Sequence, residues 1–189
     1  MGKEMGHLFV ISGPSGVGKG TLIKKIFSHI PDLQYSVSVT TRKPRKEEHE
    51  GIDYFFVDEE TFKRYIKEHK FAEWAKVHGD YKGTLMSTIV ETLSEGKNLI
   101  LEIDVQGALE IKNKFPEGVF IFIAPPSREK LEARLRGRGT EDEKSIKKRL
   151  NDACSEMEYS KYYNYIVVND ELEIAAQELK TIIMSEISK

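Results

Sequence analysis

The chain has 189 residues, of which 39% are hydrophobic and 32% charged, a composition typical of one soluble globular domain with a sizeable core. The 29 basic and 31 acidic residues leave a formal net charge of −2, which provides no bulk attraction to nucleic acid or to a membrane surface. Cys154 is the only cysteine, no leader is visible and no apolar run approaches the roughly 20 residues of a membrane span, so we expect a cytoplasmic protein without nucleic-acid or membrane partners.

Apolar runs alternate with helical periodicities along most of the chain. His7–Ser12 is typical of a buried strand, and apolar residues at helical spacing follow within Gly18–His29. We predict further strands at Asn98–Ile103, Val119–Ile123 and Tyr165–Val168, and further helices at Gln106–Lys114, Ser127 to about Arg136, from the capping box Thr140–Glu143, and at Glu171–Ile187. This order favours an α/β fold with a largely parallel sheet flanked by helices.

The stretch from Tyr35 to about Lys97 breaks this alternation. It contains short candidate strands at Ser36–Thr40, Tyr54–Val57 and Phe71–Val77 around a polar loop. We therefore predict an insertion between core units that folds as a small mixed lobe.

A glycine-rich loop follows the first strand and opens the first helix, which is the context of a Walker A phosphate-binding loop. Its glycines let backbone N–H groups turn toward phosphate oxygens, and the helix N-terminus and the lysine add positive charge. The pattern expects a hydroxyl directly after the lysine, but a glycine stands there, so we expect Mg²⁺ to be held mainly by phosphates and water. The loop consists of Gly13, Pro14, Ser15, Gly16, Val17, Gly18, Lys19, Gly20 and Thr21. The alternative is a simple glycine-rich turn.

Glu102 ends the apolar run Leu99–Leu101, and Asp104 follows two residues later. Alternation places the two carboxylates on the same side of an extended chain. In phosphate-loop enzymes an acid at such a strand end helps to order the magnesium shell, although a solvated strand end would have the same pattern.

The chain resembles the guanylate kinases, which are phosphate-loop nucleoside monophosphate kinases, over essentially its whole length. The matching segments are Gly13–Lys19, Ser38–Arg45, Gly51–Tyr54, Glu73–Ala75, Glu102–Gly107, Ile123–Ser127 and Gly137–Thr140. The resemblance implies a core (1–35, 98–127 and 150–189), a GMP-binding lobe (36–97) and a helical lid (128–149). It also implies transfer of the γ-phosphoryl group of ATP to GMP or dGMP in purine nucleotide metabolism, with Mg²⁺ as cofactor and a monomer or homodimer as the working form.

The resemblance also assigns residues. Ser38, Arg42, Arg45 and Tyr54 correspond to the family's GMP-phosphate site, while Glu73, Thr84 and Asp104, with Glu102 beside them, correspond to its guanine site. Lys19, Arg42, Arg134, Arg138 and Arg149 match the catalytic cations, and Asn169 falls near the ATP site. Lys82 stands where the family often has a tyrosine that contacts the phosphate.

Simpler interpretations remain open at several of these positions. The arginines could be solvated surface charge, and alternation alone would turn Glu73 to solvent while Trp74 packs in the core. Two other functions also fit parts of the pattern: a ribose bisphosphate phosphokinase, and a non-catalytic scaffold module of the guanylate-kinase-like type. The guanine-site residues argue against the first, and Lys19 with the lid arginines argues against the second.

Overall fold

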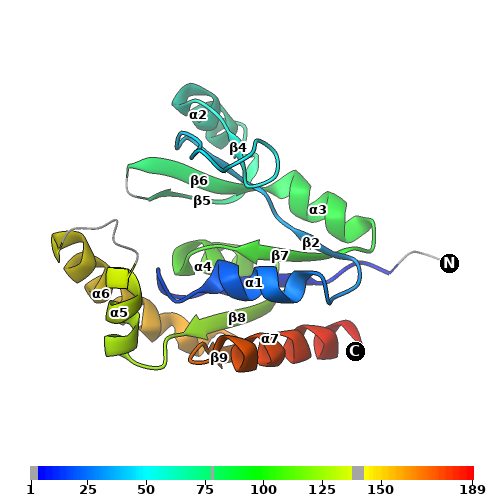
Figure 1. Ribbon diagram of the computed structural model, residues 1–189. Coiled ribbons are helices and arrows are strands. Elements are labelled where there is room, and N and C mark those ends of the chain that lie inside the picture. Colours follow the sequence, from blue (N-terminus) through cyan, green and yellow to red (C-terminus); the bar gives the residue numbers. More distant parts are fainter. Residues whose placement is uncertain (1–3, 78, 138–142) are drawn as a thin grey trace.

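The computed structural model describes residues 4–77, 79–137 and 143–189 (Figure 1). A parallel sheet of five strands, in the order β2-β7-β1-β8-β9, forms its centre. The strands are β1 (Leu8–Ser12), β2 (Leu33–Tyr35), β7 (Asn98–Glu102), β8 (Val119–Ala124) and β9 (Tyr165–Val168). The sheet confirms the predicted α/β class.

Helices cover both faces of this sheet, which explains why its central strands are continuous apolar runs rather than alternating ones. In β1, Phe9 and Ile11 pack on one face against α1 (Lys19–Phe27) and α7 (Leu172–Ile187). Leu8 and Val10 pack on the other face with apolar side chains of α3 (Met86–Ser94) and α4 (Val105–Lys114). Because all five strands are parallel, their carboxyl ends meet at one edge, where α/β folds place their ligands.

A second sheet of four strands, in the order β4-β3-β6-β5, lies to one side of the first (Figure 1). It consists of β3 (Ser38–Thr40), β4 (Tyr54–Phe56), β5 (Phe71–Val77) and β6 (Asp80–Leu85). The helix α2 (Glu59–Lys67) covers it by burying Phe62 against Val39 and Phe71. This sheet is mixed, because β3 pairs parallel with β4 and antiparallel with β6.

After two charged helices, the 3₁₀ turn η1 (Glu158–Tyr162) returns the chain to β9. These helices, α5 (Arg128–Gly137) and α6 (Glu143–Met157), lie at the carboxyl ends of the parallel strands (Figure 1). They share a small core of their own, formed by Leu131, Leu135, Ile146, Leu150 and Ala153. Leu135 also faces the phosphate loop, since a Cβ added at Gly16 would lie 2.6 Å from its Cδ2 atom. The pair is therefore an apolar unit seated against the loop.

Most predicted core elements are confirmed, and β9 has the predicted bounds. Four elements between residues 33 and 94 were not predicted from the sequence, namely β2, β6, α2 and α3. The predicted capping residue Thr140 lies outside the described residues, as do Arg138 and Gly139. Among the described helices, none has both the length and the hydropathy needed to span a bilayer.

Candidate active site

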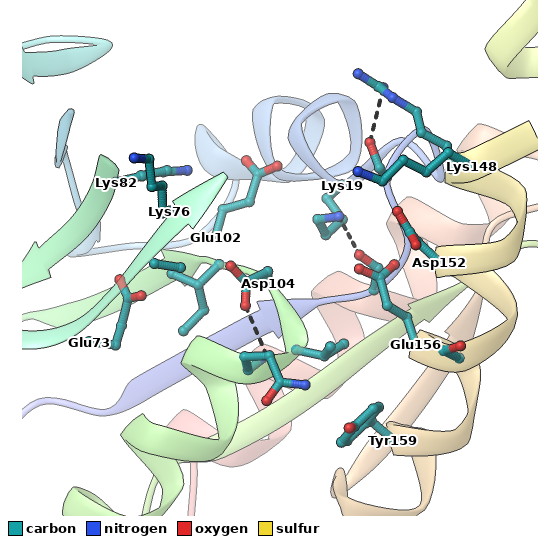
Figure 2. Close-up of a pocket in the computed structure, with 18 residues that line it drawn as sticks. Lys19, Glu73, Lys76, Lys82, Glu102, Asp104, Lys148, Asp152, Glu156 and Tyr159 are labelled. Carbon is teal, nitrogen blue, oxygen red and sulfur yellow. Dashed lines mark hydrogen bonds between the residues drawn. The ribbon is translucent and has the colours of Figure 1, made fainter. Parts of the chain in front are cut away.

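A cavity of about 650 Å³ opens between the carboxyl edge of the parallel sheet, the second sheet and α6. This size suits a small-molecule site. Seven of the predicted site residues line it, namely Gly13, Ser15, Lys19, Glu73, Glu102, Asp104 and Arg149. Figure 2 shows Glu73 and Asp104 on one side of Lys19, with Asp152 and Glu156 of α6 on the other. The phosphate loop, the acidic strand end and the buried Glu73 therefore share one space.

The glycine-rich loop that we predict to bind phosphate connects β1 to α1, as expected. Gly16 and Gly18 adopt positive φ angles of 87° and 96°, which side-chain-bearing residues rarely do. Lys19 is the first residue of α1, and its Nζ atom donates to the carbonyl oxygens of Gly13 at 2.6 Å and Pro14 at 3.1 Å. Burial lowers the pKa of Lys19, while the carboxylates of Glu102 and Glu156 oppose that shift. The ammonium is thus already bent back over the loop.

Three predicted residues hold the loop from outside. The Asn169 side-chain Nδ2 donates to the Val17 carbonyl at 2.7 Å, and Arg134 Nη1 donates to the same oxygen at 3.3 Å. Arg149 Nη1 donates to Ser15 Oγ at 3.2 Å from α6. Arg134 Nη2 also donates to the Asp170 carbonyl at 3.2 Å. The loop is therefore fastened both to the residues after β9 and to the α5–α6 pair.

Glu73 lies inside the protein, and the alternative that it faces solvent is wrong. Its exposed fraction is 4%, whereas that of Trp74 is 40%, so the polar residue is buried and the aromatic one is half exposed. Thr84 Oγ1 donates to Glu73 Oε1 at 2.6 Å. Burial raises the pKa of Glu73 to about 7, with the charge of Asp104 adding to the shift and Thr84 opposing it. A buried carboxylate with one remaining oxygen for a ligand therefore faces the cavity.

The helix α4 supports this carboxylate from behind. Asp104 caps its N-terminus, because its Oδ1 accepts from the backbone N–H groups of Gln106 at 2.8 Å and Gly107 at 2.9 Å. A Cβ at Gly107 would lie 2.7 Å from Glu73 Oε2, so glycine is needed there to admit the Glu73 side chain. Glu102, two residues before Asp104, accepts from the Tyr35 hydroxyl at 3.1 Å.

The predicted phosphate clamp forms a cluster beside the cavity rather than part of its wall. Arg42 Nη2 is held by both carboxylate oxygens of Glu48, at 2.7 and 2.8 Å, and the Arg45 backbone N–H donates to Glu48 at 2.8 Å. The Arg42 guanidinium lies 5.4 Å from the centre of the Tyr54 ring, and Lys82 Nζ, which does line the cavity, lies 5.3 Å from it. Ser38 pairs with Tyr54 in the sheet.

Apart from Arg149, the wall that α6 and η1 contribute to the cavity was not predicted from the sequence. Lys148, Asp152, Ser155, Glu156 and Tyr159 line it at helical spacing along α6 and into η1. Their three- and four-residue spacing was the available signal, but polar residues at that spacing usually form a solvated helix face. Burial raises the pKa of Glu156, and the charge of Lys19 opposes this shift.

Within the described part of the chain, no group of three or more His, Cys, Asp or Glu side chains is arranged to hold a metal ion. Arg138, the remaining predicted catalytic cation, lies outside the described residues.

Comparison with known proteins assigns the chain to a family. The family model described as guanylate kinase matches residues 5–186. The chain belongs to the guanylate kinase family. A guanylate kinase of Caldanaerobacter subterraneus subsp. tengcongensis is 51% identical over 97% of this chain and 89% of its own, and one of Halalkalibacterium halodurans is 50% identical over 98% and 91%. A crystal structure of guanylate kinase from Anaplasma phagocytophilum superimposes with a TM-score of 0.79 at 34% identity, covering 100% of this chain and 90% of that one.

Proposed function

We propose that this guanylate kinase family member transfers the γ-phosphoryl group of ATP to GMP, giving ADP and GDP, in the cavity between the two sheets. The observation that carries the proposal is that a phosphate-loop lysine, Lys19, and a buried carboxylate, Glu73, line the same cavity. The first suits a nucleoside triphosphate and the second suits a base that presents two N–H donors.

On the ATP side, the triphosphate would lie in the loop from Gly13 to Thr21. Lys19 now donates to the carbonyls of Gly13 and Pro14, and a phosphate anion would replace them as the stronger partner for its charge. Asn169 belongs to this side through its bond to Val17. We therefore propose that Asn169 acts on ATP by fixing the loop.

On the GMP side, Glu73 would accept from guanine N1–H and the exocyclic amine, with Thr84 and Asp104 beside it. Adenine has no donor at N1 and no 2-amino group, so AMP would leave the second oxygen of this buried carboxylate without a partner, which is costly. The GMP phosphate would face Arg42, Arg45, Tyr54 and Ser38, with Lys82 near the same ring. Guanidinium groups match phosphate oxygens in a bidentate manner.

The transfer itself needs no general base, because the attacking GMP phosphate oxygen carries no proton to remove. That oxygen forms a bond to the γ-phosphorus of ATP, and the bond from the γ-phosphorus to the oxygen bridging to the β-phosphate breaks, so that ADP leaves. Negative charge spreads over the equatorial oxygens during this step, and converging cations stabilise it. We assign this role to Lys19, Arg42, Arg134, Arg138 and Arg149.

Magnesium would accompany ATP, and the residues present fit it. Glu102 and Asp104 line the same cavity as Lys19, and carboxylate oxygens suit this ion. When bound, the ion would neutralise part of the charge on the triphosphate. We propose that it is held mainly by phosphates and water near Glu102 and Asp104.

The same proposal divides the chain into a core (1–35, 98–127 and 150–189), a GMP-binding lobe (36–97) and a lid (128–149). The lid arginines would reach both phosphates only when the lobes approach one another, which would also exclude water from the transfer. We expect the enzyme to work in the cytoplasm as a monomer or homodimer.

A coupled assay of ADP formation from ATP tests the function. GMP, AMP, UMP, CMP and ribose 1,5-bisphosphate are compared as acceptors, with the Lys19→Ala variant as a control for contaminating kinases. Turnover with GMP alone supports the proposal. Turnover with ribose 1,5-bisphosphate but not GMP would assign the chain to the alternative kinase, and no turnover with any acceptor would favour a binding module.

A further inference from the structure

The residue after the phosphate-loop lysine has no side chain, and a carboxylate from another strand lies against it. A Cβ added at Gly20 would be 3.4 Å from Glu102 Oε2 and 3.6 Å from Glu102 Oε1. In the usual Walker A pattern this position carries the hydroxyl that contacts Mg²⁺. Glu102 therefore borders the space that this hydroxyl would enter.

The sheet register explains how Glu102 comes to that position. Tyr35 pairs with Ile100 across β2 and β7, and Glu102 lies two residues after Ile100 on the same face. That face carries α1, since Ile100 packs with Leu22 and Ile23 of that helix. Tyr35 and Glu102 are thus diagonal neighbours on the side of the sheet where Gly20 lies.

A tyrosine is long enough to bridge such a diagonal pair. The Tyr35 hydroxyl donates to Glu102 Oε2 at 3.1 Å, and this is the same oxygen that lies nearest to the Gly20 position. The bond removes rotational freedom from a glutamate that would otherwise have several rotamers at a strand end. Glu102 Oε2 therefore adjoins both the Tyr35 hydroxyl and the position of Gly20.

We propose that Tyr35 is a positioning residue, which holds the Glu102 carboxylate beside Gly20 so that Glu102 faces the metal-bearing phosphates of the nucleotide in place of a phosphate-loop hydroxyl. The inference rests on the proposed function, because it needs the ATP site to be where Lys19 is. It adds Tyr35 to that site and explains why Gly20 is compatible with it.

The test compares nucleotide affinity with and without metal, which does not depend on turnover. The dissociation constant of ADP is measured by calorimetry in Mg²⁺ and again in EDTA, for the wild-type chain and for Tyr35→Phe. The ratio of the two constants is the metal-dependent gain. The lost bond is exposed and acts on the metal only through Glu102, so the range of an ordinary net hydrogen bond applies. The gain should therefore fall by about threefold to tenfold in Tyr35→Phe, and the EDTA value should be unchanged.

Tyr162→Phe removes the hydroxyl of an exposed tyrosine that does not itself line the cavity, and it should leave the gain unchanged. A gain in Tyr35→Phe equal to that of the wild type overturns the positioning role. A wild-type chain with no metal-dependent gain would overturn both this inference and the metal-bound ATP site of the proposed function, so the two failures are distinguishable.

A double-mutant cycle separates positioning from packing. If Tyr35 acts through Glu102, then Glu102→Gln should reduce the gain at least as much as Tyr35→Phe, and the double variant should lose no more than Glu102→Gln alone. Losses that add independently would show that the Tyr35 hydroxyl acts elsewhere. The KM for GMP should be the same in wild type and Tyr35→Phe, and a parallel rise would overturn a role confined to the metal-bearing phosphates.

Discussion

Replacing Glu73 by glutamine changes one charge and almost no volume at the most enclosed acidic side chain of the cavity. Thr84 Oγ1 can still donate to the retained Oε1 atom, and Gly107 still leaves room for the side chain. The variant should therefore fold. The substitution removes a carboxylate whose ionised form is destabilised by burial in the folded chain.

The size and sign of that destabilisation follow from the pKa of Glu73. It lies at about 7 in the folded chain against an ordinary value of 4.5, so keeping this carboxylate charged costs the fold roughly 3 kcal/mol. Because the folded pKa is raised, the contribution of Glu73 to stability is complete below about pH 4.5 and is lost as the pH rises to about 7. Glutamine does not titrate, so Glu73→Gln should gain stability over the wild type across this window, by at most about 3 kcal/mol above pH 7.

The same substitution should abolish most discrimination between bases. Glutamine presents an N–H group to the guanine donors, so the charge-assisted bonds are lost, at about 1.5–3 kcal/mol, or about 10- to 150-fold in kcat/KM for GMP. AMP makes no such bonds and should lose much less. A more stable and less active variant would show that stability is sacrificed for recognition.

Two assays measure these effects. Urea unfolding at pH 5 and pH 8 gives the stability difference, and the coupled assay gives kcat/KM for GMP and AMP. Glu91→Gln, at an exposed position on α3, should alter neither quantity. Equal losses for GMP and AMP would contradict the guanine-binding role of Glu73, and a Glu73→Gln chain less stable than wild type at pH 8 would contradict the cost of its buried charge.

Three further substitutions test the rest of the site. Lys19→Ala should reduce turnover by about 100-fold or more with an unchanged circular dichroism spectrum, because it removes the charge aimed at the triphosphate; near-wild-type turnover would contradict the loop assignment. Asn169→Ala removes the 2.7 Å bond to the Val17 carbonyl and should raise the KM for ATP by about 2- to 10-fold without changing that for GMP, whereas a rise for GMP alone would argue against loop fixing. Glu48→Gln should weaken the bidentate hold on Arg42 and raise the KM for GMP by about threefold; a fall would mean that Glu48 competes with the GMP phosphate.

Local patterns predicted the core of this fold well, because its elements are short apolar strands followed by periodic helices. The stretch from β1 through the phosphate loop into α1 is an example, since strand, glycines and helix are contiguous. The strand β6 was missed because Asp80–Leu85 contains a glycine and little β-branched character. The glycine in this strand is explained by tertiary packing, since a Cβ at Gly83 would lie 2.9 Å from the Cβ of Trp74, its partner on β5.

The site was predictable only where the resemblance supplied the pairing of distant segments. Alternation alone favoured an exposed Glu73, and only the packing of β5 against α4 reverses that choice. No local signal connects Glu48 to Arg42 through both oxygens, or Tyr35 to Glu102 across 67 residues. The acidic face of α6 has the pattern of a solvated helix until the fold places it opposite Lys19.

The most direct measurement is a competition for one phosphoryl group. Wild-type chain receives limiting ATP labelled at the γ-phosphate together with equal concentrations of GMP, AMP, CMP and UMP, and the labelled diphosphates are separated at early times. We predict label in GDP, in excess over the other three products by at least about 100-fold, with the excess sharply reduced in Glu73→Gln. Label distributed among the diphosphates, or a GDP excess that survives Glu73→Gln, would contradict it.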